Sequence, residues 1–286
     1  MPDIDPRVAG RAHRATDLLH SLIYFVPEAD EELVAVGVRP GRMCYFASRS
    51  APMGAVPASV TTATFYNFNP ELVAKYIPRA WTLASPEQII AARFRAADRA
   101  LRRLLGEDAV ASAEMAEFAE LARAATTALQ TYGRPLYAAH ADIGWPDEPH
   151  LVMWHAVTLL REYRGDGHIA ALLRAELSGI ESIITHTATG RGFNEASAKL
   201  LRGWSDAQWD TATAALVTRG VMDATGLSAE GFALRERLED DTDVMDTAAW
   251  RHLGEDHTER VIELGKQFSR AAAANGALPA GVFASA

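Results

Sequence analysis

The sequence predicts a mainly α fold, and two patterns support this prediction. Alanine-rich segments with apolar residues three and four positions apart fill almost the whole chain, whereas alternating runs of β-branched residues are nearly absent. The 286 residues are 49% hydrophobic and 23% charged, which is typical of a globular protein with one large or two smaller cores. The net charge of −9 disfavours contact with nucleic acid or anionic membranes, and the single Cys44 excludes an internal disulfide.

Start and stop signals divide the first half into helices. Three helices are expected over 7–25, 28–36 and 41–50, because a proline, a glycine and an Ala-Pro-Met-Gly turn follow them. Two further starts are strong, since Asn69 and Ser85 are each followed by proline and glutamate, the sequence of an N-cap, a first-turn proline and a first-turn acid. The Ser85 helix continues to residue 105, and another helix covers 111–130.

The stretch "REYRGDGHIAALL" interrupts two helical patterns in the second half, after a loop-like boundary at 140–150. Helices are predicted over 148–163 and 168–189. Gly165 is expected to end the first helix and Asp166 to cap the second by accepting a backbone N–H. A catalytic or metal loop is the alternative reading of the same residues.

A weak internal repeat relates the two halves. Aligning Gly54 with Gly167 places apolar residues over apolar residues, and Trp81 then matches Trp204 after a ten-residue insertion. This register predicts two copies, an N-terminal unit at 1–135 and a C-terminal unit at 136–286. The seam between such copies is where a pocket is expected.

The segment "TRGVMDATGLSAEG" at 218–231 has the order of a helix end, a short strand, a tight turn and a new helix. This segment resembles the winged helix-turn-helix of MarR-like regulators over about residues 195–240. With "TATFYNF" and "WHAVTLLREYRGDGH", the whole chain is also similar to an actinobacterial family known only as helix-turn-helix proteins. The resemblance implies tandem winged-helix-like units with a small β-wing in the second copy, and no particular activity.

The charge of this segment differs from that of a DNA-binding winged helix. Recognition helices need Arg, Asn or Gln on base edges and basic residues on phosphates. The expected recognition helix at 205–219 offers Gln208, two aspartates and Arg219, and the wing "DATG" has no basic residue. The following "RERLEDDTDVMD" is acidic, so DNA is an unlikely partner.

Candidate site residues fall into two groups. His155 and Glu162 lie on one predicted helix face with His168 just beyond, a grouping able to transfer protons or, in a structural role, to tie two helices together. Buried Arg49 would need a partner, either a ligand anion or Glu162. The ligand-binding candidates share aromatic, basic or amide side chains that could line a pocket for a planar molecule: His20, Tyr24, Tyr45, Arg49, Phe65, Tyr66, Asn67 and Trp154.

These observations predict a small-molecule-binding protein with an aromatic and histidine-lined pocket between the repeats. It could be a cofactor-independent enzyme that acts on an aromatic or carboxylate-bearing substrate, with His155 or His168 as general acid or base. A MarR-type regulator that binds DNA and a protein-interaction module are the alternatives. No metal, cofactor or membrane partner is predicted, a homodimer is one option for assembly, and the cytoplasm is the expected location because no signal or spanning segment is recognised.

Overall fold

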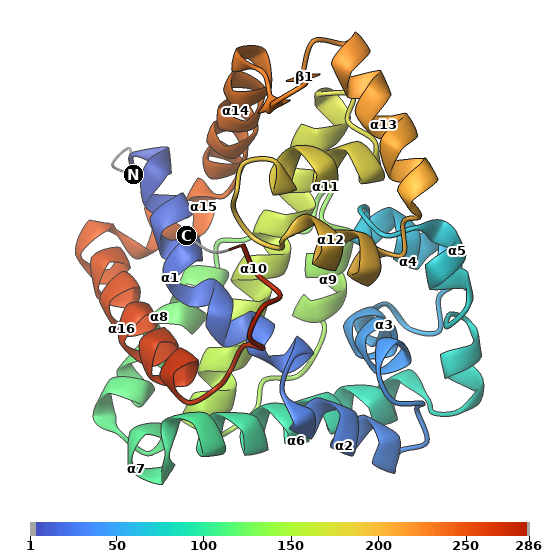
Figure 1. Ribbon diagram of the computed structural model, residues 1–286. Helices are drawn as coiled ribbons and strands as arrows, with labels where there is room; N and C mark the ends of the chain where they lie inside the picture. Colours follow the sequence, from blue (N-terminus) through green and yellow to red (C-terminus); the bar gives the residue numbers. More distant parts are fainter. Residues whose placement is uncertain (1–3, 285–286) are drawn as a thin grey trace.

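The computed structural model describes residues 4–284 and confirms a mainly helical fold (Figure 1). The first half contains, in chain order, α1 (Pro6–Ser21), η1 (Leu22–Tyr24), α2 (Pro27–Ala35), α3 (Arg42–Ser50), η2 (Ala51–Met53), α4 (Ala58–Phe65), α5 (Pro70–Ala74), η3 (Arg79–Thr82), α6 (Pro86–Leu105), α7 (Glu107–Val110), α8 (Ala113–Thr126) and α9 (Pro135–Ala141). The second half contains α10 (Pro149–Arg174), α11 (Gly179–Thr187), α12 (Glu195–Arg202), α13 (Asp206–Thr218), β1 (Met222–Asp223), β2 (Gly226–Leu227), α14 (Ala229–Met245), α15 (Thr247–Leu253) and α16 (Glu255–Ala274).

The predicted helix starts at Asn69 and Ser85 are confirmed. The Asn69 side chain accepts a hydrogen bond from the backbone N–H of Glu71 at 2.9 Å, which caps α5. Ser85 and Gln88 form a reciprocal capping box at the start of α6. The small β-wing is also present, because β1 and β2 pair antiparallel with Met222 opposite Leu227. Local hydrogen bonding within a few residues decides all three features.

The predicted break at Gly165 and Gly167 is wrong, because α10 continues through both glycines. The reason is close packing. A Cβ atom on Gly167 would collide with the guanidinium of Arg134, which donates a hydrogen bond to the Met245 carbonyl oxygen at 3.0 Å and stacks 3.9 Å from the centre of the Tyr163 ring. The glycine therefore makes room for an arginine from another segment, at a cost in helix propensity of about 1 kcal/mol.

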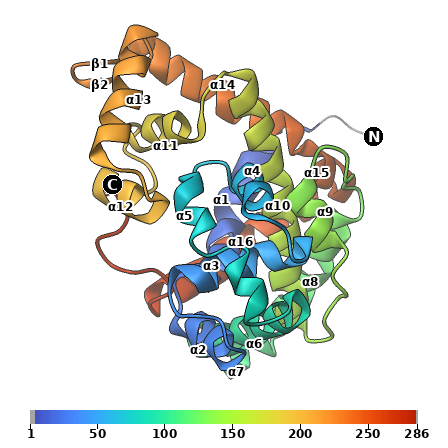
Figure 2. The ribbon, with the colours of Figure 1, turned by 90° about the vertical axis from the view of Figure 1, so that its right-hand side faces the viewer.

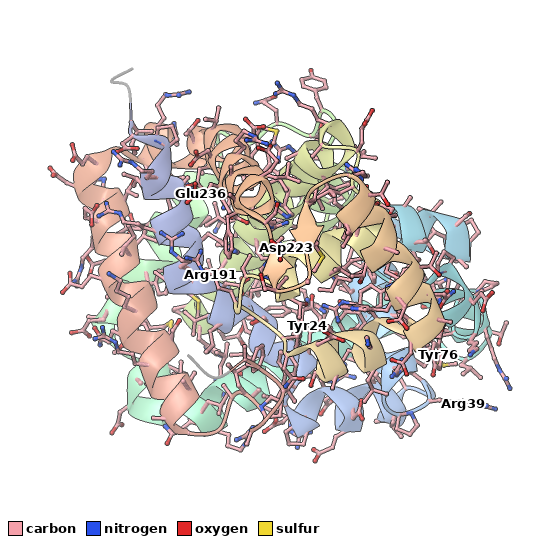
Figure 3. All side chains as sticks on the ribbon, turned by 45° about the horizontal axis from the view of Figure 1, so that its top comes forward. Tyr24, Arg39, Tyr76, Arg191, Asp223 and Glu236 are labelled. Atoms are coloured by element: carbon pink, nitrogen blue, oxygen red, sulfur yellow. The ribbon has the colours of Figure 1, made fainter. Side chains whose placement is uncertain are left out.

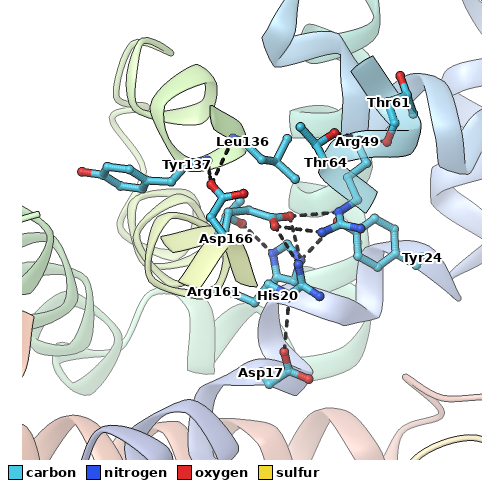
Figure 4. A network of polar contacts seen from close by, with 12 residues as sticks. Asp17, His20, Tyr24, Arg49, Thr61, Thr64, Leu136, Tyr137, Arg161 and Asp166 are labelled. Carbon is cyan, nitrogen blue, oxygen red and sulfur yellow. Dashed lines mark hydrogen bonds and ion pairs between the residues drawn. The ribbon is translucent and has the colours of Figure 1, made fainter. Parts of the chain in front are cut away.

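Asp166 caps a helix, but not the one that the sequence indicated. Its Oδ2 accepts hydrogen bonds from the backbone N–H groups of Leu136 and Tyr137, at 3.0 and 2.9 Å, in the first turn of α9 (Figure 4). The following helix, α11, is instead capped by Ser178 and Glu181 in a capping box. A carboxylate in the middle of one helix thus satisfies the orphan donors of another.

Three hydrophobic cores are arranged around α10, which runs through the middle of the molecule in both ribbon views (Figures 1 and 2). The largest core joins α1, α6, α8, α10, α15 and α16. A second core lies under α2, α3, α5 and the start of α6, and a third lies between the end of α10 and α11–α14. Within residues 4–284, no helix has an apolar stretch that could cross a bilayer.

The predicted alignment of Gly54 with Gly167 is also wrong, because the two glycines have different backbone surroundings. Gly54 ends η2 with a φ of 79°, whereas Gly167 lies within α10. Another correspondence exists, since "TATFYNFN" at 62–69 recurs as "TATGRGFN" at 187–194, and the final asparagine of each segment caps a short helix. Duplication, like the division into units at 1–135 and 136–286, stays a prediction; the largest core contains residues from both units.

We expect Asp166→Ala to destabilise the protein by about 1–3 kcal/mol, because two buried N–H groups lose their acceptor. Burial raises the pKa of Asp166 to about 6, although the bonds from Tyr137 and Leu136 oppose this shift. A folded pKa above the unfolded value means that the stability contributed by Asp166 is present at low pH and is lost as the pH rises through about 6. The cost of the substitution should therefore be larger at pH 4.5 than at pH 7.5.

Urea unfolding of both proteins at the two pH values measures this difference. Asp166→Asn is the matched control, since the amide oxygen can still accept the two hydrogen bonds and does not titrate. A cost of Asp166→Ala that increases with pH would contradict the assignment.

Candidate functional site

A buried carboxylate, Glu162 of α10, lies at the centre of the candidate site. The side chain of Arg49 from α3 forms a bidentate ion pair with it, with Nε 3.1 Å from Oε1 and Nη2 2.9 Å from Oε2 (Figure 4). Arg161 adds a third contact, from Nη1 to Oε2 at 2.6 Å. Of the two partners that the sequence suggested for a buried Arg49, a ligand anion or Glu162, the structure contains Glu162.

The electrostatics of this pair keep both groups charged. Burial by itself would raise the pKa of Glu162, but Arg161 and Arg49 outweigh burial and hold its pKa well below the usual range. Burial by itself would lower the pKa of Arg49, but the charge of Glu162 raises it well above the usual value. The ion pair is thus a permanent feature at neutral pH.

His20 at the end of α1 lies beside Glu162, with Nε2 3.9 Å from Oε1, and is hydrogen bonded to two neighbouring hydroxyl groups. The Thr158 hydroxyl donates its proton to the Trp154 carbonyl oxygen at 2.8 Å, so it must accept from His20 Nδ1 at 3.0 Å. His20 Nε2 is then the acceptor for the Tyr24 hydroxyl at 3.2 Å. Burial lowers the pKa of His20 well below 6.5 although Glu162 opposes this shift, and the neutral Nδ1–H tautomer follows from these bonds.

Aromatic rings surround Arg49. Its Nη1 donates to the Tyr45 hydroxyl at 3.3 Å, and its Cζ lies 4.4 Å from the centre of the Phe65 ring. The rings of Tyr45 and Tyr24 pack edge to face at 5.0 Å. The structure therefore brings together the predicted residues His20, Tyr24, Tyr45, Arg49, Phe65 and Glu162, which with Arg161 and Thr158 we call the Glu162 cluster.

Tyr66 and Asn67 lie at the junction with the helix-turn-helix. The Tyr66 hydroxyl donates to the Leu177 carbonyl oxygen at 2.5 Å. Asn67 accepts at its side-chain oxygen from Arg202 Nε at 3.0 Å, and at its backbone oxygen from the Trp204 indole at 3.0 Å. Asn67 thus anchors the turn between α12 and α13, and Tyr66 holds the segment before α11. The role of both residues in ligand binding stays a prediction.

Arg202, at the end of α12, is a feature that sequence reasoning missed. Its Cζ lies 4.4 Å from the centre of the Phe68 ring, and it forms no ion pair with any residue between 4 and 284. Burial lowers its pKa, and so do the nearby charges of Arg49 and Arg161, although Tyr45 opposes the shift. We call Arg49, Arg161 and Arg202 the seam arginines.

The predicted grouping of His155, Glu162 and His168 around one point does not form. His155 packs against Trp145, with ring centres 4.8 Å apart, and burial lowers its pKa to about 4. His168 points to α14, where its Nδ1 lies 2.9 Å from the Thr242 hydroxyl oxygen, and burial lowers its pKa to about 3. The reason is that α10 is continuous, so residues spaced along it contact different helices.

Trp154, the remaining predicted ligand residue, is 1% exposed and lies against Arg93 rather than in the Glu162 cluster. Arg93 Cζ is 5.2 Å from the centre of its ring. No sequence signal distinguished Arg93 from the other arginines of the amphipathic α6.

The helix-turn-helix consists of α12, a turn at Gly203 and α13, the expected recognition helix. The two side chains suited to base contacts both form internal hydrogen bonds. Gln208 accepts at its side-chain oxygen from the backbone N–H of Ser205 at 3.0 Å, and Arg219 donates to the Glu176 carbonyl oxygen at 3.0 Å and to Glu181 at 3.2 Å. The side chains that remain exposed on α13 are acidic, small or apolar, and Asp223 lies in the wing (Figure 3).

Comparison with known proteins identifies one relationship. Residues 9–279 match a helix-turn-helix family. No curated protein and no solved structure matches this chain.

We expect Glu162→Gln to cost about 3–5 kcal/mol at pH 7, because it leaves Arg49 buried without a counter-charge. The pKa of Glu162 is depressed in the folded state, so its contribution is present above the unfolded value of about 4.3 and is lost as the pH falls below it. The variant should therefore lose less stability than the wild type on acidification.

Chemical denaturation between pH 3.5 and 7 tests this expectation. The control is Glu263→Gln on α16, where the side chain is 67% exposed and the change should stay within about 0.5 kcal/mol. Equal costs for the two variants would show that Glu162 is not the charge on which the cluster depends.

Proposed function

Because the chain belongs to a helix-turn-helix family, we propose that it is a winged-helix-derived protein that binds a small organic anion at the seam arginines. The observation that carries the proposal is the charge balance there. Arg49 and Arg161 share the carboxylate of Glu162, and Arg161 Nε also lies 3.9 Å from the half-exposed Asp17. The carboxylates of Glu162 and Asp17 therefore balance the charges of Arg49 and Arg161. Arg202 has an amide oxygen and aromatic rings as partners, so its positive charge is the one that remains to be balanced.

The surroundings of the seam arginines suit a planar, carboxylate-bearing molecule. A guanidinium group can bind a carboxylate through two parallel hydrogen bonds, which a lysine cannot reproduce. Tyr24, Tyr45 and Phe68 supply apolar walls and hydroxyl groups, and both tyrosines are only partly buried. The proposed ligand is therefore an aromatic or carboxylate-bearing organic anion.

Binding, rather than catalysis, is the activity proposed. The enzyme hypothesis gave acid or base roles to His155 and His168, with Arg49 holding a carboxylate or stabilising an enolate or phenolate. His155 packs on Trp145 of the segment between α9 and α10, and His168 contacts Thr242 of α14. Burial lowers the pKa of each histidine. The proposal therefore assigns no reaction to the site.

A DNA-binding regulator is the second candidate, favoured by the helix-turn-helix family. Specific recognition needs free donors on the recognition helix and basic side chains beside it. The guanidinium of Arg219 is occupied by internal hydrogen bonds, and Arg219 is the only basic residue between 206 and 227. Small-molecule binding is for this reason the preferred proposal.

Arg202→Met should reduce the affinity for benzoate or 4-hydroxybenzoate by about tenfold or more, because one charge-assisted hydrogen bond contributes about 1.5–3 kcal/mol. Calorimetric titration measures the affinity, and native mass spectrometry of the purified protein tests for a retained ligand. Arg79→Met, at an exposed arginine of η3, is the matched control and should bind like the wild type. Equal affinities of the two variants would remove Arg202 from the site.

Duplex DNA should bind no more tightly than the non-specific range of about 10⁻⁴–10⁻⁶ M at physiological salt, because α13 and the wing present so little positive charge. Fluorescence anisotropy with duplexes from the neighbourhood of the gene measures this affinity. A nanomolar, sequence-selective complex would establish the regulator instead.

A further inference from the structure

Arg93 of α6 is buried without a counter-charge from any residue between 4 and 284. It is 2% exposed, and its Nη2 donates a hydrogen bond to the Tyr24 hydroxyl at 3.2 Å. Its Nε and Nη1 atoms have no hydrogen-bond partner within residues 4–284, and no carboxylate of that part forms an ion pair with it. Glu162 cannot serve, because it is already paired with Arg49 and Arg161.

Three neighbouring side chains are also buried and incompletely bonded. Trp154 Nε1, His140 Nε2 and His155 Nε2 have no hydrogen-bond partner among the described residues. Arg93 lies against the Trp154 ring, and it acts electrostatically on both histidines. We call these four residues the Arg93 cluster.

The chemistry of the cluster specifies what it lacks. Arg93 and Trp154 can only donate hydrogen bonds, and a neutral histidine offers one donor and one acceptor. Burial lowers the pKa of His140 to about 3 and that of His155 to about 4, so both are neutral at pH 7. An oxygen acceptor satisfies the donors, and a negative charge balances Arg93.

A surface groove of about 460 Å³ lies directly beside the cluster, between α6 and the segment that joins α9 to α10. Its lining is mostly apolar and comprises Pro52, Glu87, Ile90, Ala91, Phe94, Ala139, Asp142, Ile143, Gly144, Pro146 and Leu151. None of the site residues predicted from the sequence lines it.

The groove and the Arg93 cluster share a wall. Phe94 and Ala139 line the groove and are the chain neighbours of Arg93 and His140. The Phe94 ring packs on Trp154 and His155, with ring centres 5.3 and 5.6 Å apart. The half-buried Phe94 therefore separates the apolar groove from the buried donors.

We propose that the groove and the Arg93 cluster together form a second binding site, for a carboxylate with an apolar tail. The carboxylate accepts hydrogen bonds from Arg93 and Trp154, and the tail occupies the groove over Phe94 and Ile90. The site is separate from the seam arginines and does not depend on the function proposed for them.

Titration of the full-length protein with acetate, butyrate, hexanoate and octanoate at constant ionic strength tests the proposal, with hexanamide as the uncharged probe. The affinity should rise by about fourfold for each added methylene group, because the tail enters an apolar groove. Hexanamide should bind at least about tenfold more weakly than hexanoate, since it cannot balance a buried charge.

Arg93→Met should abolish the preference for hexanoate over hexanamide and leave the melting temperature unchanged or higher, because it removes an uncompensated buried charge. Arg79→Met, at an exposed arginine of η3, is the matched control and should keep the full preference for hexanoate over hexanamide. Ala91→Trp, at an exposed position of the groove, should weaken octanoate binding while acetate binding stays the same.

Three results would overturn the proposal. The first is that the wild-type protein gives no larger binding signal with any of the carboxylates than with sodium chloride. The second is that the Arg93→Met protein keeps the full preference for hexanoate over hexanamide. The third is that an experimental structure determined with octanoate shows only water at Arg93. If Arg93→Met does not fold, the preference for hexanoate over hexanamide is measured with Arg93→Gln, and the dependence of the affinity on tail length is measured with Ala91→Trp.

Discussion

The buried ion pair of Glu162 with Arg49 is the interaction on which much of the structure depends. A carboxylate that is 1% exposed can remain ionised only if cations and hydrogen-bond donors replace its water. Arg49 supplies two of these bonds from α3, and Arg161 supplies one from the same helix as Glu162. The need to pair the buried carboxylate fixes the position of α3 against α10. His20 then contacts Thr158 of α10, and Tyr24 packs on Tyr45 of α3.

Helix α10 distributes polar groups to several parts of the molecule. Its 26 residues span about 39 Å, so side chains at different heights meet different partners. His155 faces Trp145, Glu162 faces Arg49, Asp166 caps α9, and His168 contacts α14. Arg93 donates to the Tyr24 hydroxyl, which donates to His20 beside Glu162, so hydrogen bonds run from the Arg93 cluster to the Glu162 cluster.

The helix-turn-helix illustrates that shape and affinity for DNA have separate causes. The arrangement of α12 and α13 rests on the Asn194 cap of α12, the capping box of α13, a glycine turn and the bond from the Trp204 indole to Asn67. Affinity for DNA rests on exposed positive charge, which these residues do not need in order to fold. In this chain the side chain of Gln208, which could read a base, completes the cap of α13 instead.

The sequence by itself determined the features that depend on neighbours within one turn of chain. These are the helical class, the caps at Asn69 and Ser85, and the β-wing, because each rests on hydrogen bonds or periodicity local to its segment. The pairing of Arg49 with Glu162 was also inferable, because a buried arginine requires an anion.

Only the tertiary structure decided the rest. Gly167 has the same sequence signature whether it ends a helix or makes room for an arginine, and Arg134 from a distant segment settles the choice. Arg93 and Arg202 look like ordinary arginines of amphipathic helices, since the sequence does not reveal that Arg93 is buried or that Arg202 packs on aromatic rings. Burial and the absence of a charged partner are properties of packing between segments, so no local pattern encodes them.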